Sequence, residues 1–210
     1  MPDLGPPRPS DQELLRRHVA GDADAFGELF RRHRDRLWAV ALRTVCDPEE
    51  AADALQDAMV SAFRRAADFR GESAVTTWLH RIVVNAALDR LRRKAVRPAV
   101  SATDEQAFEA LVTHGSDPAR AADTRLDVDA ALRILPPQQR AALVLVDMLG
   151  YSVNDAAAIM NTSTGTIKSR CARGRARLLP HVAHLRGEAG YSGGNRSTTG
   201  SVQPAQGGDT

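Results

Sequence analysis

Apolar residues recur every three or four positions along most of the chain, which is the spacing of amphipathic helices. The first predicted helix follows Ser10, which forms a capping box with Glu13. Asp22 can cap a second helix. Asp47 and Pro48 mark the start of a third, because they supply a cap acceptor and a proline at the first helical position.

A fourth helix is expected from about residue 75 to residue 94, after a loop at residues 69–73. Residues 95–123 then contain proline, glycine, serine and scattered acids without helical spacing. This stretch is too long for an ordinary connection within one compact domain, so it is interpreted as a linker. Helical spacing resumes near Thr124.

Capping signals also organise the carboxy-terminal part. Pro136-Pro137 opens a helix that should continue to about Met148. Ser152 caps a short helix, and a polar turn at residues 161–163 joins it to a final helix that ends near residue 186.

These elements predict an all-α protein with two small helical domains and a flexible linker. The composition agrees, since 43% of the residues are hydrophobic but only 4% are aromatic, which favours helices over a β-sandwich or barrel. A glycine-rich strand–turn–helix unit is missing from the sequence, so Rossmann and P-loop chemistry are not expected. The expected divisions are a disordered start at 1–9, a helical domain at 10–96, the linker at 97–123, a second helical domain at 124–186 and a disordered tail at 187–210.

Bulk properties exclude several classes of protein. The formal net charge of +2 points to no partner, so only the local distribution of charge is informative. Cys46 and Cys171 lie far apart in helical patterns and suggest no disulfide, and His181 with His184 lacks the further ligands that a metal site needs. Without a long apolar span or a signal peptide, we expect a cytoplasmic protein that does not insert into membranes.

Residues 151–170 have the pattern of a helix-turn-helix, with an alanine-rich short helix, a polar turn and a basic helix. One stripe of the second helix should face the core: Ile167, Cys171, Gly174 and Leu178. Between Asp155 and Glu188 the chain has no acidic residue. DNA is therefore the expected partner, with Arg173 as the candidate for reading guanine and the helix start suited to phosphate. The candidate DNA-contacting residues are Thr164, Thr166, Lys168, Ser169, Arg170, Ala172 and Arg173.

Two sets of polar residues in the first domain are candidates for a functional role. Asp53, Gln56 and Asp57 share one helix face, which fits a solvated surface, a docking surface or a hydrolytic site. Asn85 and Asp89 leave the core together on the fourth helix, whereas Trp78 suits either the core or a DNA-facing position. The residue pattern alone does not choose between these readings.

Three segments together resemble the sigma-70 superfamily, and in particular the small extracytoplasmic-function (ECF) sigma factors, nearest the SigM-like subgroup. Residues 50–59 are similar to the family's polymerase-binding helix. Residues 69–93, from Phe-Arg-Gly-Glu-Ser to Asp-Arg-Leu-Arg-Arg, resemble its promoter-melting region. Residues 135–170 resemble its minus-35-binding domain.

The resemblance implies a role for each group. Asp53, Gln56 and Asp57 would bind a clamp coiled coil in the largest subunit of core RNA polymerase, while other contacts reach the flap. The loop at residues 69–73 would capture a base flipped out of the DNA, and Asn85 would help to read it. The implied minus-10 and melting residues are Phe69, Arg70, Ser73, Trp78, Asn85, Asp89, Arg92 and Arg93. An anti-sigma factor is implied as a further partner, and no cofactor, metal or enzymatic activity is.

Some alternatives stay open. The acidic linker suits either the basic channel of a polymerase or an ordinary polar connection. Gly174 stands where the family usually has alanine, and it either loosens the helix or permits closer packing. A stand-alone helix-turn-helix regulator would bind duplex DNA by itself as a dimer. A nucleic-acid-processing enzyme would use Asp53 and Asp57 with a divalent metal.

Overall fold

Helices make up all the regular secondary structure in the residues described by this computed structural model, 8–96 and 128–188, with side chains of the last helix placed as far as Val182. The expected all-α fold is confirmed for these residues, while the linker at 97–123 and the two expected disordered termini fall almost wholly outside them. Residues 128–133 are also helical. The named elements are α1 (Asp11–Val19), α2 (Ala25–Val45), α3 (Pro48–Arg64), the 3₁₀ turn η1 (Ala66–Asp68), α4 (Val75–Val96), α6 (Pro137–Leu143), the π-helical turn η2 (Val144–Met148), α7 (Val153–Ile159) and α8 (Thr164–Glu188).

Three predicted helix starts are confirmed by their caps. The side chains of Ser10, Asp47 and Ser152 each accept a hydrogen bond from the backbone amide three residues later, at 3.1 Å in every case. Asp22 acts slightly differently, since its carboxylate accepts hydrogen bonds from the backbone amides of Asp24, the residue before α2, and Ala25, the first residue of α2. Local sequence therefore determines where these helices begin.

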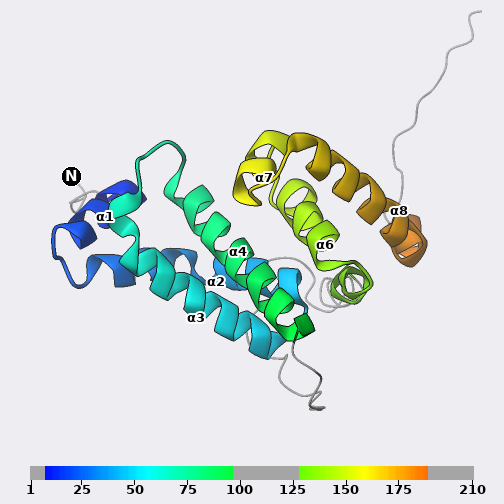
Figure 1. Ribbon diagram of the computed structural model, residues 1–210, viewed down its shortest axis with the longest axis horizontal. Coiled ribbons are helices and arrows are strands. Elements are labelled where there is room, and N and C mark those ends of the chain that lie inside the picture. Colours follow the sequence, from blue (N-terminus) through cyan, green and yellow to red (C-terminus); the bar gives the residue numbers. More distant parts are fainter. Residues whose placement is uncertain (1–7, 97–127, 189–210) are drawn as a thin grey trace, which may run out of the picture.

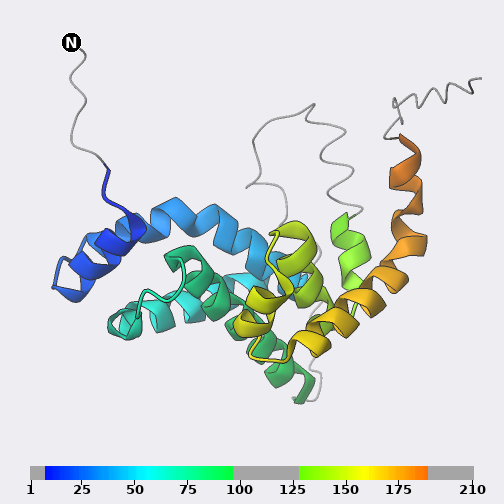
Figure 2. The same cartoon turned by 90° about the horizontal axis from the view of Figure 1, so that it is seen from above.

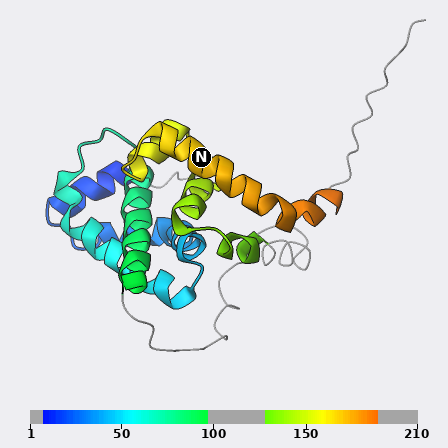
Figure 3. The same ribbon diagram turned by 45° about the vertical axis from the view of Figure 1, so that its right-hand side comes forward.

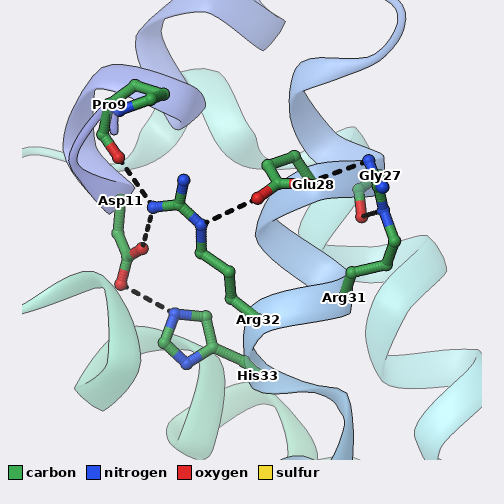
Figure 4. Close-up of polar contacts among 7 residues, drawn as sticks. All are labelled: Pro9, Asp11, Gly27, Glu28, Arg31, Arg32 and His33. Carbon is green, nitrogen blue, oxygen red and sulfur yellow. Dashed lines mark hydrogen bonds and ion pairs between the residues drawn. The ribbon is translucent and has the colours of Figure 1, made fainter. Parts of the chain in front are cut away.

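The first unit consists of α2, α3 and α4 packed on one another, with α1 lying across α2 (Figure 1). A polar network fixes the start of α1 on α2 (Figure 4). Arg32 donates to the carbonyl of Pro9 at 2.6 Å and to Glu28 at 3.1 Å, and Asp11 lies 2.7 Å from the Nε2 of His33. These contacts orient α1, which also forms one wall of a surface hollow.

The second unit consists of α6, η2, α7 and α8, and small residues bring its helices close together. Ala156 and Ala157 of α7 are buried. A Cβ placed on Gly174 of α8 would lie 2.8 Å from Cδ1 of Leu143 in α6. Gly174 therefore permits close packing of α8 on α6, which was one of the two roles expected for this glycine.

Three local features differ from the sequence prediction or were missed by it. The helix expected to run to about Met148 becomes π-helical at Val144, and this turn carries Asp147, which pairs with Arg175 of α8 at 2.6 and 2.9 Å. Cys46, expected within a helical pattern, instead ends α2 in the left-handed conformation, with φ of 60°. Pro180 lies inside α8, and Figure 2 shows that this helix bends along its length.

The two units pack against each other and share a continuous apolar core (Figures 1 and 3). Helix α4 contacts α6 and α7, and α2 contacts α6 and η2. Arg140 of α6 is 5% exposed, and its guanidinium donates to the carbonyl of Thr44 at the end of α2 at 2.8 Å. The sequence left the relation between the units undecided, whereas the structure joins them closely. None of the described helices is long and apolar enough to cross a membrane.

Candidate nucleic-acid interface

Asp53, Gln56 and Asp57 are all exposed on α3, as their helical spacing predicts. The two carboxylates are nonetheless paired with α4. Asp53 binds Arg90, and Asp57 lies 3.5 Å from Arg93. These are surface ion pairs, which contribute at most about 1 kcal/mol each, so another cationic or anionic partner can replace them.

Arg90 occupies a central position in this ion-pair row. It binds both Asp53 and Glu50, and Glu50 also lies 3.0 Å from Lys94. Partial burial would raise the pKa of Glu50, but hydrogen bonds from Lys94 and Arg90 lower it below its ordinary value. The predicted polymerase-docking face on α3 is therefore electrostatically linked to the basic side chains of α4.

A hollow of about 500 Å³ lies between α3 and α4. It brings together Asp57 with four of the predicted minus-10 residues: Trp78, Asn85, Asp89 and Arg93. Arg81 and Ile82 of α4 also line it, together with Ser61 and Arg65, which sequence reasoning missed. Helical spacing could have indicated Ser61, which stands four positions after Asp57.

The loop after η1 is tied to the hollow by an aromatic pair. The ring of Phe69 lies 5.5 Å from that of Trp78, centroid to centroid. Phe69 and Arg70 themselves line a second hollow of about 550 Å³ against α1, while Ser73 is exposed. The structure thus places the loop residues and Asn85 on different hollows, separated by the aromatic pair. Trp78 is 5% exposed, so it belongs mainly to the core.

The remaining predicted residues of α4 already have partners. Arg92 pairs with Asp89 on the same helix. The Nδ2 of Asn85 donates to the backbone carbonyl of Ile159 in α7, at 3.2 Å. The base-reading amide proposed by resemblance therefore contacts the second unit of the same chain.

The exposed side of α8 carries the predicted minus-35 residues. Thr164, Lys168, Ala172 and Arg173 are exposed, whereas Thr166, Ser169 and Arg170 are half-buried. Opposite them, Ile167 and Cys171 are buried, as the predicted stripe requires.

Hydrogen bonds within the helix occupy part of this face. The Nε of Arg173 donates to the carbonyl of Ser169 at 3.2 Å, which folds the side chain along its own helix. The hydroxyl of Ser163 accepts a hydrogen bond from the backbone amide of Thr166 at 3.2 Å. One of the amides expected to be available for phosphate is therefore already used within the helix cap.

The two basic faces lie close to each other. Burial lowers the pKa of Arg170, and the positive charges of Arg173 and of Arg92 on α4 lower it further. Cations predicted to bind separate stretches of DNA thus repel one another here.

Other chemistry finds little support in the described part of the chain. There, no three or more histidine, cysteine or carboxylate side chains gather in a way that could hold a metal ion. Cys46 and Cys171 are both free thiols, and burial raises the pKa of each.

Comparisons with known proteins identify the family. Residues 29–97 match the model of Sigma-70 region 2, and residues 125–178 match that of Sigma-70, region 4. The chain is 50% identical over 176 residues to the ECF RNA polymerase sigma factor SigM of Mycobacterium tuberculosis, covering 84% of this chain and 86% of that protein. It is 33% identical over 174 residues to the ECF RNA polymerase sigma-E factor of Escherichia coli K12, covering 79% and 91%.

Solved structures agree with the sequence relatives. The sigma factor RpoE in complex with the anti-sigma factor NepR, from Bartonella quintana, matches with a TM-score of 0.58 and 26% identity over 77% of this chain and 98% of that one. CnrH in complex with the cytosolic domain of CnrY matches with a TM-score of 0.57 and 27% identity over 85% and 99%. With both sigma regions matched in order and these identities over most of the chain, the protein belongs to the ECF sigma factors of the sigma-70 family.

Proposed function

We propose that this chain binds core RNA polymerase in the cytoplasm and directs it to promoters by reading one DNA element with each helical unit. The observation that carries this proposal is the hollow between α3 and α4. It places Asn85 and Asp89 beside Trp78 in a space of about 500 Å³, which lies in the range of small-ligand sites. A flipped base needs polar groups to read its edge. This hollow supplies them, and the Phe69–Trp78 pair connects it to the loop expected to capture the base.

Polymerase docking is assigned to the exposed face of Asp53, Gln56 and Asp57. A basic surface on the clamp coiled coil of the largest subunit would replace the ion pairs that Arg90 and Arg93 make with this face. Because exposed pairs are weak, the exchange costs little. It would also leave Arg93 available for phosphate.

Minus-35 reading is assigned to α8. Lys168, Ala172 and Arg173 project from the side opposite the buried Ile167 and Cys171, which is how a recognition helix presents residues to the major groove. Arg173 must leave Ser169 to make a bidentate contact with guanine. Thr164 and Thr166 lie at the start of the helix, where a phosphate would approach, and this unit would also contact the flap of the polymerase.

The remaining assignments follow from family membership. A sigma factor reads and opens promoter DNA, so we assign this chain no bond-making chemistry and no cofactor. The sigma factor RpoE of Bartonella quintana, which was solved with the anti-sigma factor NepR, supports an anti-sigma factor as a further partner of this chain. Membership also favours this function over a stand-alone helix-turn-helix regulator.

In vitro transcription tests the proposal. Core RNA polymerase is incubated with a library of genomic promoters, with or without the full chain, and transcript starts are mapped. We expect start-specific transcripts only when the chain is present, with two shared elements upstream. Duplex binding by the free protein without any gain of initiation on core polymerase would support the stand-alone regulator instead.

A further inference from the structure

The contact between the two units lies on the surfaces that a sigma factor needs for promoter reading. Asn85 of α4 donates to the carbonyl of Ile159, the last residue of α7, at 3.2 Å. Carbonyls at the end of a helix lack partners within that helix, so this is a favourable acceptor. Asn85 has two amide protons, and this contact uses one of them and holds the side chain against protein.

Arg140 anchors the contact from the other side. Besides its bond to Thr44, its guanidinium donates to the carbonyl of Val45 at 3.5 Å and to that of Leu132 at 3.3 Å. Thr44 and Val45 end α2, where the helix dipole is negative, so a buried cation from the second unit caps a helix of the first. A buried guanidinium is stable only with such partners, which makes the contact specific.

A third contact lies on α4 itself. The Nδ1 of His80, which is 2% exposed, lies 2.7 Å from the hydroxyl of Tyr151, and the two rings meet edge to face. Tyr151 directly precedes Ser152, the cap residue of α7. The second unit is thus held at the end of α2 and at two positions of α4.

This arrangement does not permit both promoter elements to be read together. The minus-10 and minus-35 elements are named by their distance from the transcription start. They therefore lie about 25 base pairs apart, which is about 85 Å along a B-form duplex. Here the helix that carries Asn85 touches α7, and the cations of α4 and α8 are close enough for Arg92 to affect Arg170. The units must separate before each can bind its own element.

We propose that the second unit is an intramolecular inhibitor of the first, and that Arg140 on the end of α2 is the latch that holds it. This inference rests on the proposed function, because inhibition is defined against minus-10 reading. Opening releases Asn85 and separates the cations of α4 from those of α8. A protein in which one-tenth of the molecules are open binds DNA about tenfold more weakly than a fully open one.

The test uses the full chain with Arg140→Gln, which removes the cation, and Tyr151→Phe, which removes only the hydroxyl bound to His80. Arg133→Gln is the matched control, because it removes the same charge from an exposed side chain of the second unit. Hydrogen exchange in α4 and α7 reports opening without reference to any function. Fluorescence anisotropy then measures binding of a single-stranded minus-10 oligonucleotide, taken from a promoter mapped in the transcription assay.

We expect faster exchange in α4 and α7 and about tenfold tighter oligonucleotide binding for Arg140→Gln, a smaller gain for Tyr151→Phe and none for Arg133→Gln. Unchanged exchange and affinity in a folded Arg140→Gln would overturn the latch. If that variant does not fold, unchanged exchange and affinity in Tyr151→Phe would overturn it instead. Failure of the wild type to support initiation on core polymerase would count against the proposed function, whereas the exchange result would still show whether the latch exists.

Discussion

At the scale of single residues, Gly174 shows how packing can override helix propensity. Alanine usually stabilises a helix interior by about 1 kcal/mol over glycine. Here the added Cβ would lie 2.8 Å from a methyl group of Leu143, which is 2% exposed and cannot move into solvent. We expect Gly174→Ala to lower the free energy of unfolding by about 1–2 kcal/mol, measured by urea denaturation. Gly27→Ala in α2, where nothing lies within 4 Å, should instead stabilise the protein. Stabilisation by both substitutions would contradict this account.

His80 makes stability depend on pH. Burial, followed by the nearby charges of Arg36 and His33 on α2, lowers its pKa from 6.5 to about 4, and its Nε2 finds no hydrogen-bond partner among the described residues. Between these values the unfolded chain binds more protons than the folded one, so stability falls as the pH falls from 6.5 towards 4. The loss from this one group can reach about 3 kcal/mol.

The measurement is the urea midpoint from pH 7.5 to pH 4.5 for the wild type and for His80→Gln, which cannot take up a proton. The variant should lose much of the acid-dependent destabilisation. His181→Gln, at an exposed position on α8, should retain it. Equal pH profiles for the wild type and His80→Gln would show that other groups cause the effect.

At the scale of elements, substitutions on the exposed face of α3 should weaken polymerase docking without affecting folding. Asp53→Ala with Asp57→Ala removes two exposed carboxylates whose ion pairs contribute little to stability. We expect affinity for core polymerase to fall about tenfold or more, while thermal unfolding changes by little. Asp35→Ala, on the exposed side of α2, is the control. Unchanged core affinity in the double variant would place the docking surface elsewhere.

A substitution on the exposed face of α8 should weaken promoter reading without affecting polymerase docking. Arg173→Ala removes the side chain best placed for a bidentate base contact, which should cost about 1–3 kcal/mol of discrimination at one base pair. Transcription from mapped promoters should fall and tolerate substitutions at that position, with core affinity retained. Arg177→Ala, further along the same helix, should leave the base preference at that promoter position unchanged. Parallel losses of initiation and core binding would contradict the assignment.

The elements also show what the sequence can and cannot predict. The starts at Ser10, Asp47 and Ser152 were predictable because a cap needs only residues three positions apart. The exposed face of Asp53 and the buried stripe of Ile167 follow from helical period in the same way. The π-helical turn at Val144 and the division of the loop and Asn85 between two hollows depend on contacts between elements, which no local pattern encodes.

At the scale of the whole molecule, the continuous core implies that the two units unfold together. Both tryptophans, Trp38 and Trp78, lie in the first unit, so their fluorescence reports that unit, whereas circular dichroism at 222 nm reports every helix. For the wild type we expect the two urea transitions to coincide. Arg140→Gln should separate them, because the carbonyls at the end of α2 lose a buried donor, at about 1–3 kcal/mol. The second unit should then unfold first, with helical signal lost before fluorescence changes, while Arg133→Gln should behave like the wild type. Separated transitions in the wild type would mean that the shared core does not couple the two units.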